Sequence, residues 1–134
     1  GLTQPLNWDL PHLVQLPWNL DAELHYFSEF DIGIMPLYNF PFTQGKCAFK
    51  IIQYMAAGIP VVASPVGSNL DALQDGVQGF LADSAQQWQD SLAQLMDNAE
   101  LRQTMGAAGQ RTVREKFSLE GHWEHYANLI LECL

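Results

Sequence analysis

The stretch from residue 44 to residue 67 limits the folds open to this chain more than any other part of its sequence. It reads QGKCAFKIIQYMAAGIPVVASPVG, in which Gly58 and Pro60 close a short apolar segment and a β-branched run follows at residues 59–62. Glycine and proline mark turns, and a short apolar run between turn residues is typical of a buried strand. The stretch therefore predicts a glycine-containing loop, a helix, a tight turn and a buried strand, in that order.

Two lysines give the predicted helix a polar face. Lys46 and Lys50 are four residues apart, and Gln53 follows three residues later, so on a helix the three side chains share one side. The other side would carry the packing residues Phe49, Ile52, Met55 and Ala56. No other Lys or Arg precedes Arg102, in a span that holds eleven carboxylates. The pair indicates a site for an anion, usually phosphate; the alternative is one strand and helix of an ordinary α/β core with solvated lysines.

The composition excludes several classes of protein. At 134 residues, of which 48% are hydrophobic, the chain is long enough for one globular domain with its own core. Its net charge of −9 argues against binding to nucleic acid or to an anionic membrane surface, because phosphate backbones require clustered basic side chains. No stretch is long and apolar enough for a transmembrane segment, and no signal peptide is visible. We therefore expect a cytoplasmic location. The chain also lacks an initiating Met, so we expect a processed or truncated piece.

The metal-ligating residue types form no known site motif. Cys47 and Cys133 are isolated, and neither CxxC nor HExxH occurs. His122 and His125 are three residues apart and would lie near each other on a helix, where they are either solvated or two ligands of a metal. We expect no metal and no cofactor.

Helical and strand patterns alternate along the rest of the chain. Asn19 or Asp21 can cap a helix that runs to about Phe30, and the apolar run at residues 32–37 is typical of a strand covered on both faces. Further strands are predicted at residues 12–16 and 78–82, with loop or edge structure at residues 1–12. Further helices are predicted from Ser68 or Asn69 to Leu73, from Ala85, from Asp97 or Asn98, and after Ser118. The alternation predicts an α/β fold with a partial, doubly wound (Rossmann-like) parallel sheet, ending in two or three helices.

Two adjoining motifs resemble the signature of a known enzyme family. IIQYMAAG at residues 51–58, PVVAS at 60–64 and the glycine at 67 match a helix of the form LLEYMAAG followed by PVVAS and a glycine turn. DIGIMPL at 31–37 and QGFLA at 78–82 match the segments that precede and follow it. The order is similar to that of the retaining glycosyltransferases of the GT-B fold, family 4 type. The resemblance extends over roughly residues 13–130 and implies the carboxy-terminal, donor-binding half of such an enzyme.

The resemblance implies a crevice outside the carboxyl ends of the strands, between residues 38–46 and 64–69, that binds a nucleoside diphosphate sugar. Family members place two glutamates at the donor sugar and at the ribose; the matching positions are Gly45 and Gln53, and neither is a carboxylate. Gln53 can still accept one hydroxyl hydrogen bond and donate another. The implied donor-binding residues are Gly45, Gln53, Ser64 and Gly67. Lys46 and Lys50 are the catalytic candidates, because departure of the sugar leaves negative charge on the pyrophosphate.

A complete family member also has an acceptor-binding domain and a central first strand, and the resemblance implies that both are missing from residues 1–134. The leading interpretation is the donor-binding part of a retaining glycosyltransferase, inactive on its own. The alternative, favoured by the missing carboxylates, is a non-catalytic α/β binding or packing module, a degenerate relative of such enzymes. Without the central strand, the strands near residues 32, 60 and 79 would be adjacent and the early strand displaced. The apolar edge near Ile32 would then permit self-association.

Overall fold

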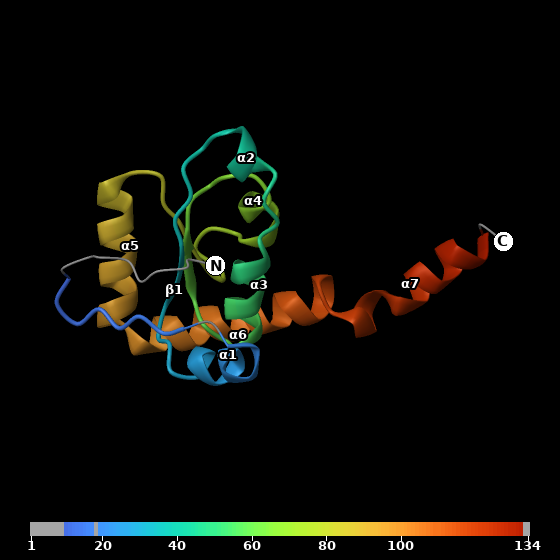
Figure 1. The fold of residues 1–134 in the computed structure, drawn as a ribbon, viewed down its shortest axis with the longest axis horizontal. Helices are drawn as coiled ribbons and strands as arrows, with labels where there is room; N and C mark the ends of the chain where they lie inside the picture. Colours follow the sequence, from blue (N-terminus) through green and yellow to red (C-terminus); the bar gives the residue numbers. More distant parts are fainter. Residues whose placement is uncertain (1–9, 18, 133–134) are drawn as a thin grey trace.

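The computed structural model describes residues 10–17 and 19–132, in which helices and strands alternate (Figure 1). The first part contains helix α1 (Leu20–Phe27), strand β1 (Gly33–Met35), helices α2 (Pro41–Gln44) and α3 (Phe49–Ala56), and strand β2 (Val61–Ala63). The second part contains α4 (Asn69–Ala72), β3 (Gly79–Leu81), α5 (Ala85–Asp97), α6 (Ala99–Lys116) and α7 (Leu119–Glu132). This order confirms the predicted α/β class and the helical end of the chain. Most of the loop or edge predicted at residues 1–12 lies outside the described residues.

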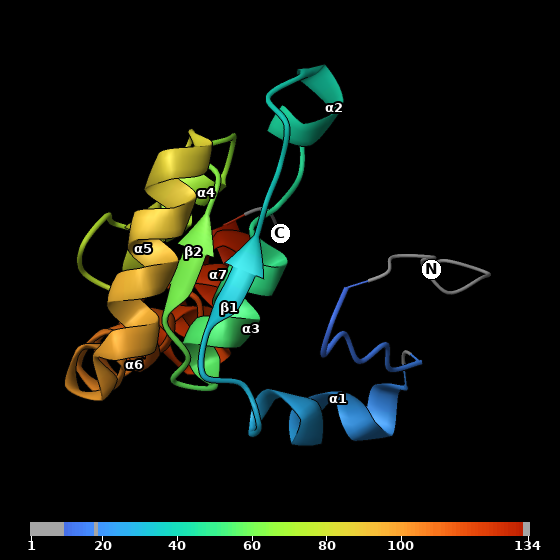
Figure 2. The same cartoon turned by 90° about the vertical axis from the view of Figure 1, so that its left-hand side faces the viewer.

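The three strands form one parallel sheet in the order β1, β2, β3. Gly33 pairs with Val61, and Val61 pairs with Gly79, so the strands start level with one another. Helix α5 covers one face of the sheet, and helices α3 and α4 cover the other (Figures 1 and 2). Helices on both faces of a parallel sheet are the doubly wound arrangement that the sequence predicts.

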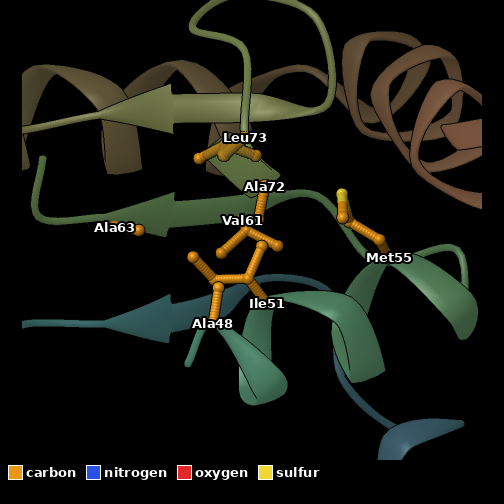
Figure 3. Close-up of a cluster of buried hydrophobic side chains, with 7 residues drawn as sticks. All are labelled: Ala48, Ile51, Met55, Val61, Ala63, Ala72 and Leu73. Atoms are coloured by element: carbon orange, nitrogen blue, oxygen red, sulfur yellow. The ribbon is translucent and has the colours of Figure 1, made fainter. Parts of the chain in front are cut away.

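Strand β2 lies at the centre of the core because its alternate side chains face opposite layers. The layer of α3 and α4 buries Ala48, Ile51, Met55, Val61, Ala63, Ala72 and Leu73 (Figure 3). The layer of α5 and α6 buries Val62, Ala82, Leu95 and Met105. Full burial of one Val or Leu side chain contributes about 1.5–3 kcal/mol, so burial on both sides anchors β2 and the loops that leave its ends.

Helix α3 packs through Ile51 and Met55, whose exposed fractions are both 0%. The predicted packing face is confirmed at Met55 and, in part, at the half-buried Ile52, and Ile51 adds to it. It is wrong at Phe49, which is 59% exposed, and at Ala56, which is also exposed. The helix begins at Phe49, so Lys46 precedes it and does not share its polar face with Lys50. The short helix α2, which the sequence analysis did not predict, precedes this start.

Helix α6 crosses α3 at two glycines. A Cβ atom at Gly109 would lie 3.1 Å from the Cβ of Met55, and one at Gly106 would overlap the carbonyl oxygen of Gly58. Glycine inside a helix costs about 0.5–1 kcal/mol relative to alanine. Here the missing side chains permit the backbones of α6 and of the segment at residues 55–58 to approach closely. Helix α6 continues through both glycines as one helix.

The last two helices begin at the predicted caps. The Asn98 side chain accepts a hydrogen bond from the Leu101 N–H (2.9 Å), and the Ser118 hydroxyl accepts one from the Gly121 N–H (3.1 Å). Helix α7 points away from the rest of the fold (Figure 1) and has no buried residue. Its apolar side chains, such as Trp123 at 55% exposure, therefore face solvent. Among the described residues, no helix is long and apolar enough to span a membrane.

Three predictions in the amino-terminal part of the chain are wrong. Residues 12–16 form no strand, because no described strand lies beside them to supply ladder hydrogen bonds. Within the described residues, β1 pairs with β2 alone and is therefore an edge strand. Ile34 of β1 is 52% exposed, so β1 is not covered on both faces. Helix α1 also ends at Phe27, short of the predicted Phe30.

Candidate functional site

Ser64 joins the carboxyl ends of β1 and β2. Its backbone N–H donates to the carbonyl oxygen of Met35 (3.1 Å), and its hydroxyl oxygen accepts a hydrogen bond from the Leu37 N–H (3.0 Å). Ser64 is buried and its hydroxyl is already hydrogen-bonded, so it connects the loop after β1 to the loop after β2. Asn69, which the sequence analysis treated only as a helix start, donates from Nδ2 to the Ser64 carbonyl (2.9 Å). Its buried Oδ1 has no hydrogen-bond partner within the described structure.

The turn at Gly67 contacts the end of helix α2. Gly67 has a φ of +53°, and a Cβ atom there would lie 2.5 Å from the carbonyl oxygen of Gln44. Only glycine combines that backbone conformation with that approach at low cost. The structure therefore brings the loop that contains Gly45 against the turn at Gly67, as the predicted crevice requires.

The loop at residues 38–46 is held together by Thr43, which is buried. The Thr43 hydroxyl donates to the carbonyl oxygen of Tyr38 and accepts from the Phe40 N–H (3.2 Å). Aromatic rings of the same loop point outward, since Phe42 is 71% exposed. The Lys46 ammonium lies over the Phe42 ring, 5.5 Å from its centroid. Lys46 therefore lies on the loop that leads into α3, beside the exposed Phe42 ring.

Lys50 lies in the first turn of α3 and reaches toward α1. Its Nζ atom is 2.6 Å from Oε1 of Glu23 and 5.5 Å from the centroid of the Phe27 ring. The Lys50 side chain is 48% exposed, so solvent screens this ion pair and its contribution to stability is small. Helix α3 itself begins without a side-chain cap, because the residue at its amino end is Ala48.

Gln53 lies one turn further along α3 and lines a pocket of about 370 Å³ between α1 and α3. The other lining residues are Phe27, Ser28, Ala56 and Ala57. The Oε1 atom of Gln53 is buried and has no hydrogen-bond partner among the described residues. A buried acceptor left unpaired costs about 1–3 kcal/mol, so a ligand that donates a hydrogen bond there would be favoured.

Tyr54, a residue that the sequence analysis did not select, fills the corner between β1 and α1. Its ring lies where a side chain at Gly33 would have to start, and it meets the Phe27 ring edge-on at 5.5 Å. Burial raises the pKa of the Tyr54 phenol, and the nearby Lys50 ammonium partly opposes that rise. In the sequence, Tyr54 looks like any residue of an amphipathic helix. Only the contact with Gly33 in the structure shows that its ring fills this corner.

The structure divides the predicted site residues into two sets. Gly45 and Lys46 belong to the loop that meets the turn of Gly67 above Ser64. The second set, Lys50 and Gln53, faces α1 instead. Lys50 lies in the first turn of α3, directly after the loop that carries the first set.

The described residues contain no group of three or more His, Cys, Asp or Glu side chains that could hold a metal. His122 and His125 both lie on α7. The Nε2 atom of His122 is 2.8 Å from the carbonyl oxygen of Lys116, and both imidazole rings contact the Tyr126 ring.

Comparison with known sequences gives a family match. The family described as glycosyl transferases group 1 matches residues 7–98. The D-inositol 3-phosphate glycosyltransferase of Paenarthrobacter aurescens is 31% identical over 109 residues, which are 80% of this chain and 24% of that protein. The chain thus spans about a quarter of the length of that relative.

Solved structures show the same fold. Sucrose-phosphate synthase from Thermosynechococcus elongatus superposes with a TM-score of 0.69 at 24% identity, covering 81% of this chain and 26% of that one. The Anabaena protein HepE, in complex with UDP and glucose, superposes with a TM-score of 0.68 at 18% identity, covering 80% of this chain and 29% of that one. Both superpositions show that this chain shares the fold of these proteins over about four fifths of its length.

Proposed function

This chain belongs to the group 1 glycosyl transferases, and we propose that it is the donor-binding part of a retaining enzyme that transfers a sugar from a nucleoside diphosphate to an acceptor. HepE holds UDP and glucose, so a uridine diphosphate sugar is the first donor to test. The acceptor would be held by a domain outside residues 1–134.

The unpaired buried oxygen of Gln53 carries this proposal. A buried polar atom without a partner requires an explanation, and a bound ligand is one of the few available. The pocket that Gln53 lines is otherwise mostly apolar, since Phe27 and two alanines line it and Ser28 is the one other polar residue. A ribose hydroxyl can donate to Oε1 while its neighbouring hydroxyl accepts from the Gln53 amide. Gln53 is therefore proposed as the ribose contact.

The start of α3 suits the diphosphate. A helix without a side-chain cap leaves its first N–H groups free to bind an anion, and Lys50 lies in that turn. Residues 50 and 53 are separated by about 4.5 Å along a helix axis. A nucleoside diphosphate that lies along α3 would thus place phosphate near Lys50 and ribose near Gln53, with Lys46 on the approach from the crevice.

The lysines would act when the sugar leaves. Cleavage of the bond between the anomeric carbon and the phosphate oxygen leaves negative charge on the diphosphate, and fixed positive charge nearby lowers the barrier. Residues 32–70 contain no Asp or Glu, and the carboxylate that opposes Lys50 is Glu23 of α1. Gly45, Ser64 and Gly67 would shape the crevice that receives the donor sugar.

A non-catalytic binding module is the second candidate, and one observation favours it. Gly45 stands at a position where family members carry a glutamate, and no carboxylate occurs between residues 32 and 70 to replace it. Such a module would bind nucleotide without taking part in transfer.

Calorimetry with UDP, GDP and ADP tests the proposal. Replacement of Lys46 or Lys50 with Ala should weaken binding by about 1–3 kcal/mol if either makes a charge-assisted bond to phosphate. Gln53→Ala should bind more weakly, and Gln53→Glu should bind more tightly by about 1 kcal/mol, because a carboxylate accepts from both ribose hydroxyls and Lys50 offsets its charge. Lys116→Ala, at the end of α6, removes the same charge away from the site and should have no effect.

Equal affinities in all of these variants would contradict the site. We also expect the 134-residue chain alone to show no transfer, because both reactants must be held together for the reaction. Robust transfer by the purified chain would contradict the division of labour between two domains.

A further inference from the structure

Helix α7 carries an apolar stripe that the rest of the described structure leaves exposed. Four of its large apolar residues follow one another at steps of four, three and four positions: Leu119, Trp123, Tyr126 and Ile130. Apolar residues at alternating steps of four and three lie on one side of a helix, and they form the seam along which two helices pack together. These four residues are called the α7 stripe below.

The helix itself indicates that this stripe is covered by a partner. Helix α7 has 14 residues, none of them buried, and it continues beyond the end of α6, away from the sheet (Figure 1). An isolated helix of this length is marginal in water, because helices in proteins are stabilised mainly by the burial of their apolar side. That burial is missing in the single chain, since Ile130 is 64% exposed.

The stripe is large enough for a weak contact between two proteins. An aromatic side chain buries about 150–250 Å² when it is covered, and more than half of Trp123 and of Tyr126 is exposed, so these two residues offer roughly 200 Å² per chain. Leu119 and Ile130 add to this area. Two copies of the stripe packed together therefore form an interface of the transient class, which buries less than about 1,200 Å² in total.

The charges beside the stripe fit a second copy of the same chain. Helix α7 contains three Glu residues and no Lys or Arg, whereas Arg114 and Lys116 lie in the last turn of α6. None of these residues forms an ion pair within the described part of the chain. If two α7 helices lie antiparallel, then Glu132 at the end of one helix comes beside the last turn of α6 in the other copy, because α7 starts at Leu119, soon after α6 ends. A parallel pair would instead place Glu132 beside the same residue of the second copy, and like charges disfavour that arrangement.

We propose that the α7 stripe is a self-association surface, on which α7 of a second copy of this chain packs antiparallel. Trp123 of each copy would face Tyr126 of the other, and Leu119 would face Ile130. The pair has two-fold symmetry, so the interface uses the same residues of both chains and closes at the dimer. No candidate nucleotide-binding residue takes part, so the inference goes beyond the proposed function and does not depend on it.

Hydrogen exchange followed by mass spectrometry on the full 134-residue chain tests the dimer, because it reports on residues 119–132 separately from the edge of β1. A dissociation constant of about 100 µM pairs about four fifths of the chains at a concentration of about 1 mM, and few of them at about 10 µM. Exchange in α7 should therefore be about four-fold slower at the higher concentration, because amides of a paired helix open less often.

Two neighbouring substitutions form a matched pair. Ile130→Glu places a charge in the stripe and should abolish the effect of concentration on exchange in α7. Leu131→Glu adds the same charge at a residue of similar exposure, 66% against 64%, that lies about 100° further around the helix, and it should preserve the effect. Each variant is compared with itself at the two concentrations, so a change in the helix of the single chain does not affect the result.

Charge reversal tests the antiparallel direction. Glu132→Lys should weaken the effect of concentration, and the further changes Arg114→Glu and Lys116→Glu in the same chain should restore it. Exchange in α7 that does not depend on concentration overturns the proposal and would assign the stripe to a different chain or domain. An equal effect in Ile130→Glu overturns the stripe as the interface, and failure of the charge reversal to restore pairing overturns the antiparallel arrangement.

Discussion

The Lys50 ammonium and the Glu23 carboxylate, 27 residues apart in sequence, form an ion pair of 2.6 Å between α3 and α1. Glu23 therefore competes with any phosphate that approaches Lys50. Glu23→Gln should raise the affinity for UDP by two- to five-fold at low salt, which corresponds to about 0.4–1 kcal/mol, the range of a partly exposed pair. The gain should shrink as salt screens the charges.

Calorimetry at two salt concentrations measures this effect. Glu29→Gln is the matched control, because Glu29 follows α1 and pairs only with the exposed His25 in the described structure. An equal gain in UDP affinity in both variants would indicate a general effect of net charge. It would contradict the hypothesis that Glu23 competes with phosphate for Lys50.

The contact at Gly67 can be separated from its backbone conformation. Gly67→Ala places a Cβ 2.5 Å from the Gln44 carbonyl oxygen at a φ of +53°, whereas Gly76→Ala has a φ of +75° and nothing within 4 Å of its new Cβ. Gly76→Ala should cost about 1 kcal/mol of unfolding free energy from backbone strain alone. Gly67→Ala should cost more and should also weaken UDP binding. Urea denaturation of the two variants checks this order; equal losses would mean that the loop at residues 38–46 moves freely away from the turn.

The edge strand β1 should mediate self-association. Its free edge and the 52% exposed Ile34 offer backbone groups and apolar surface to another chain. We expect concentration-dependent dimers in sedimentation velocity, and Ile34→Lys should weaken them at least about ten-fold, or about 1.4 kcal/mol. Leu70→Lys changes a residue of similar exposure on α4 and should leave the dimer intact. A wild-type chain that stays monomeric at high concentration would contradict this role of β1.

Tyr54 should titrate above the usual pKa of a tyrosine, which is about 10. Burial disfavours the phenolate, and Lys50 opposes this effect, so Lys50→Ala should raise the pKa of Tyr54 further. Because the folded state holds the proton more tightly, it loses stability as the pH rises through this pKa. Absorbance titration of the wild type minus that of Tyr54→Phe isolates the phenol. A difference curve centred at the usual pKa would show that the corner between β1 and α1 is open to water.

The sequence analysis succeeded where the chemistry is local. Helices α6 and α7 start where predicted because Asn98 and Ser118 cap their own first turns. The burial of Thr43 in the loop before α3 follows no periodic pattern, so the sequence analysis did not find it. The strand predicted at residues 12–16 fails for a similar reason, since an extended apolar pattern does not show whether a partner strand is present.

The candidate site shows the same limit. The motif correctly places Gly45 and Gly67 on neighbouring loops, because parallel strands end at one edge of a sheet. The direction of Lys50 and Gln53 toward α1 depends on how α1 packs, which the spacing of residues within α3 cannot reveal. The division of the predicted site residues into two sets therefore depends on tertiary packing and could not be predicted from the sequence.

The glycine contacts between α3 and α6 also determine how the molecule can move. Backbones in such close contact open together, so the amide hydrogens of α3 and α6 should exchange as one cooperative unit, while α7, which buries no residue, should exchange earlier and alone. In the pocket between α1 and α3, the α3 side is therefore held rigidly by α6, whereas the α1 side is held less tightly. Adjustment to a bound nucleotide would then fall mainly on α1, and a slowing of amide exchange in α1 would be the dynamic signature of an occupied site.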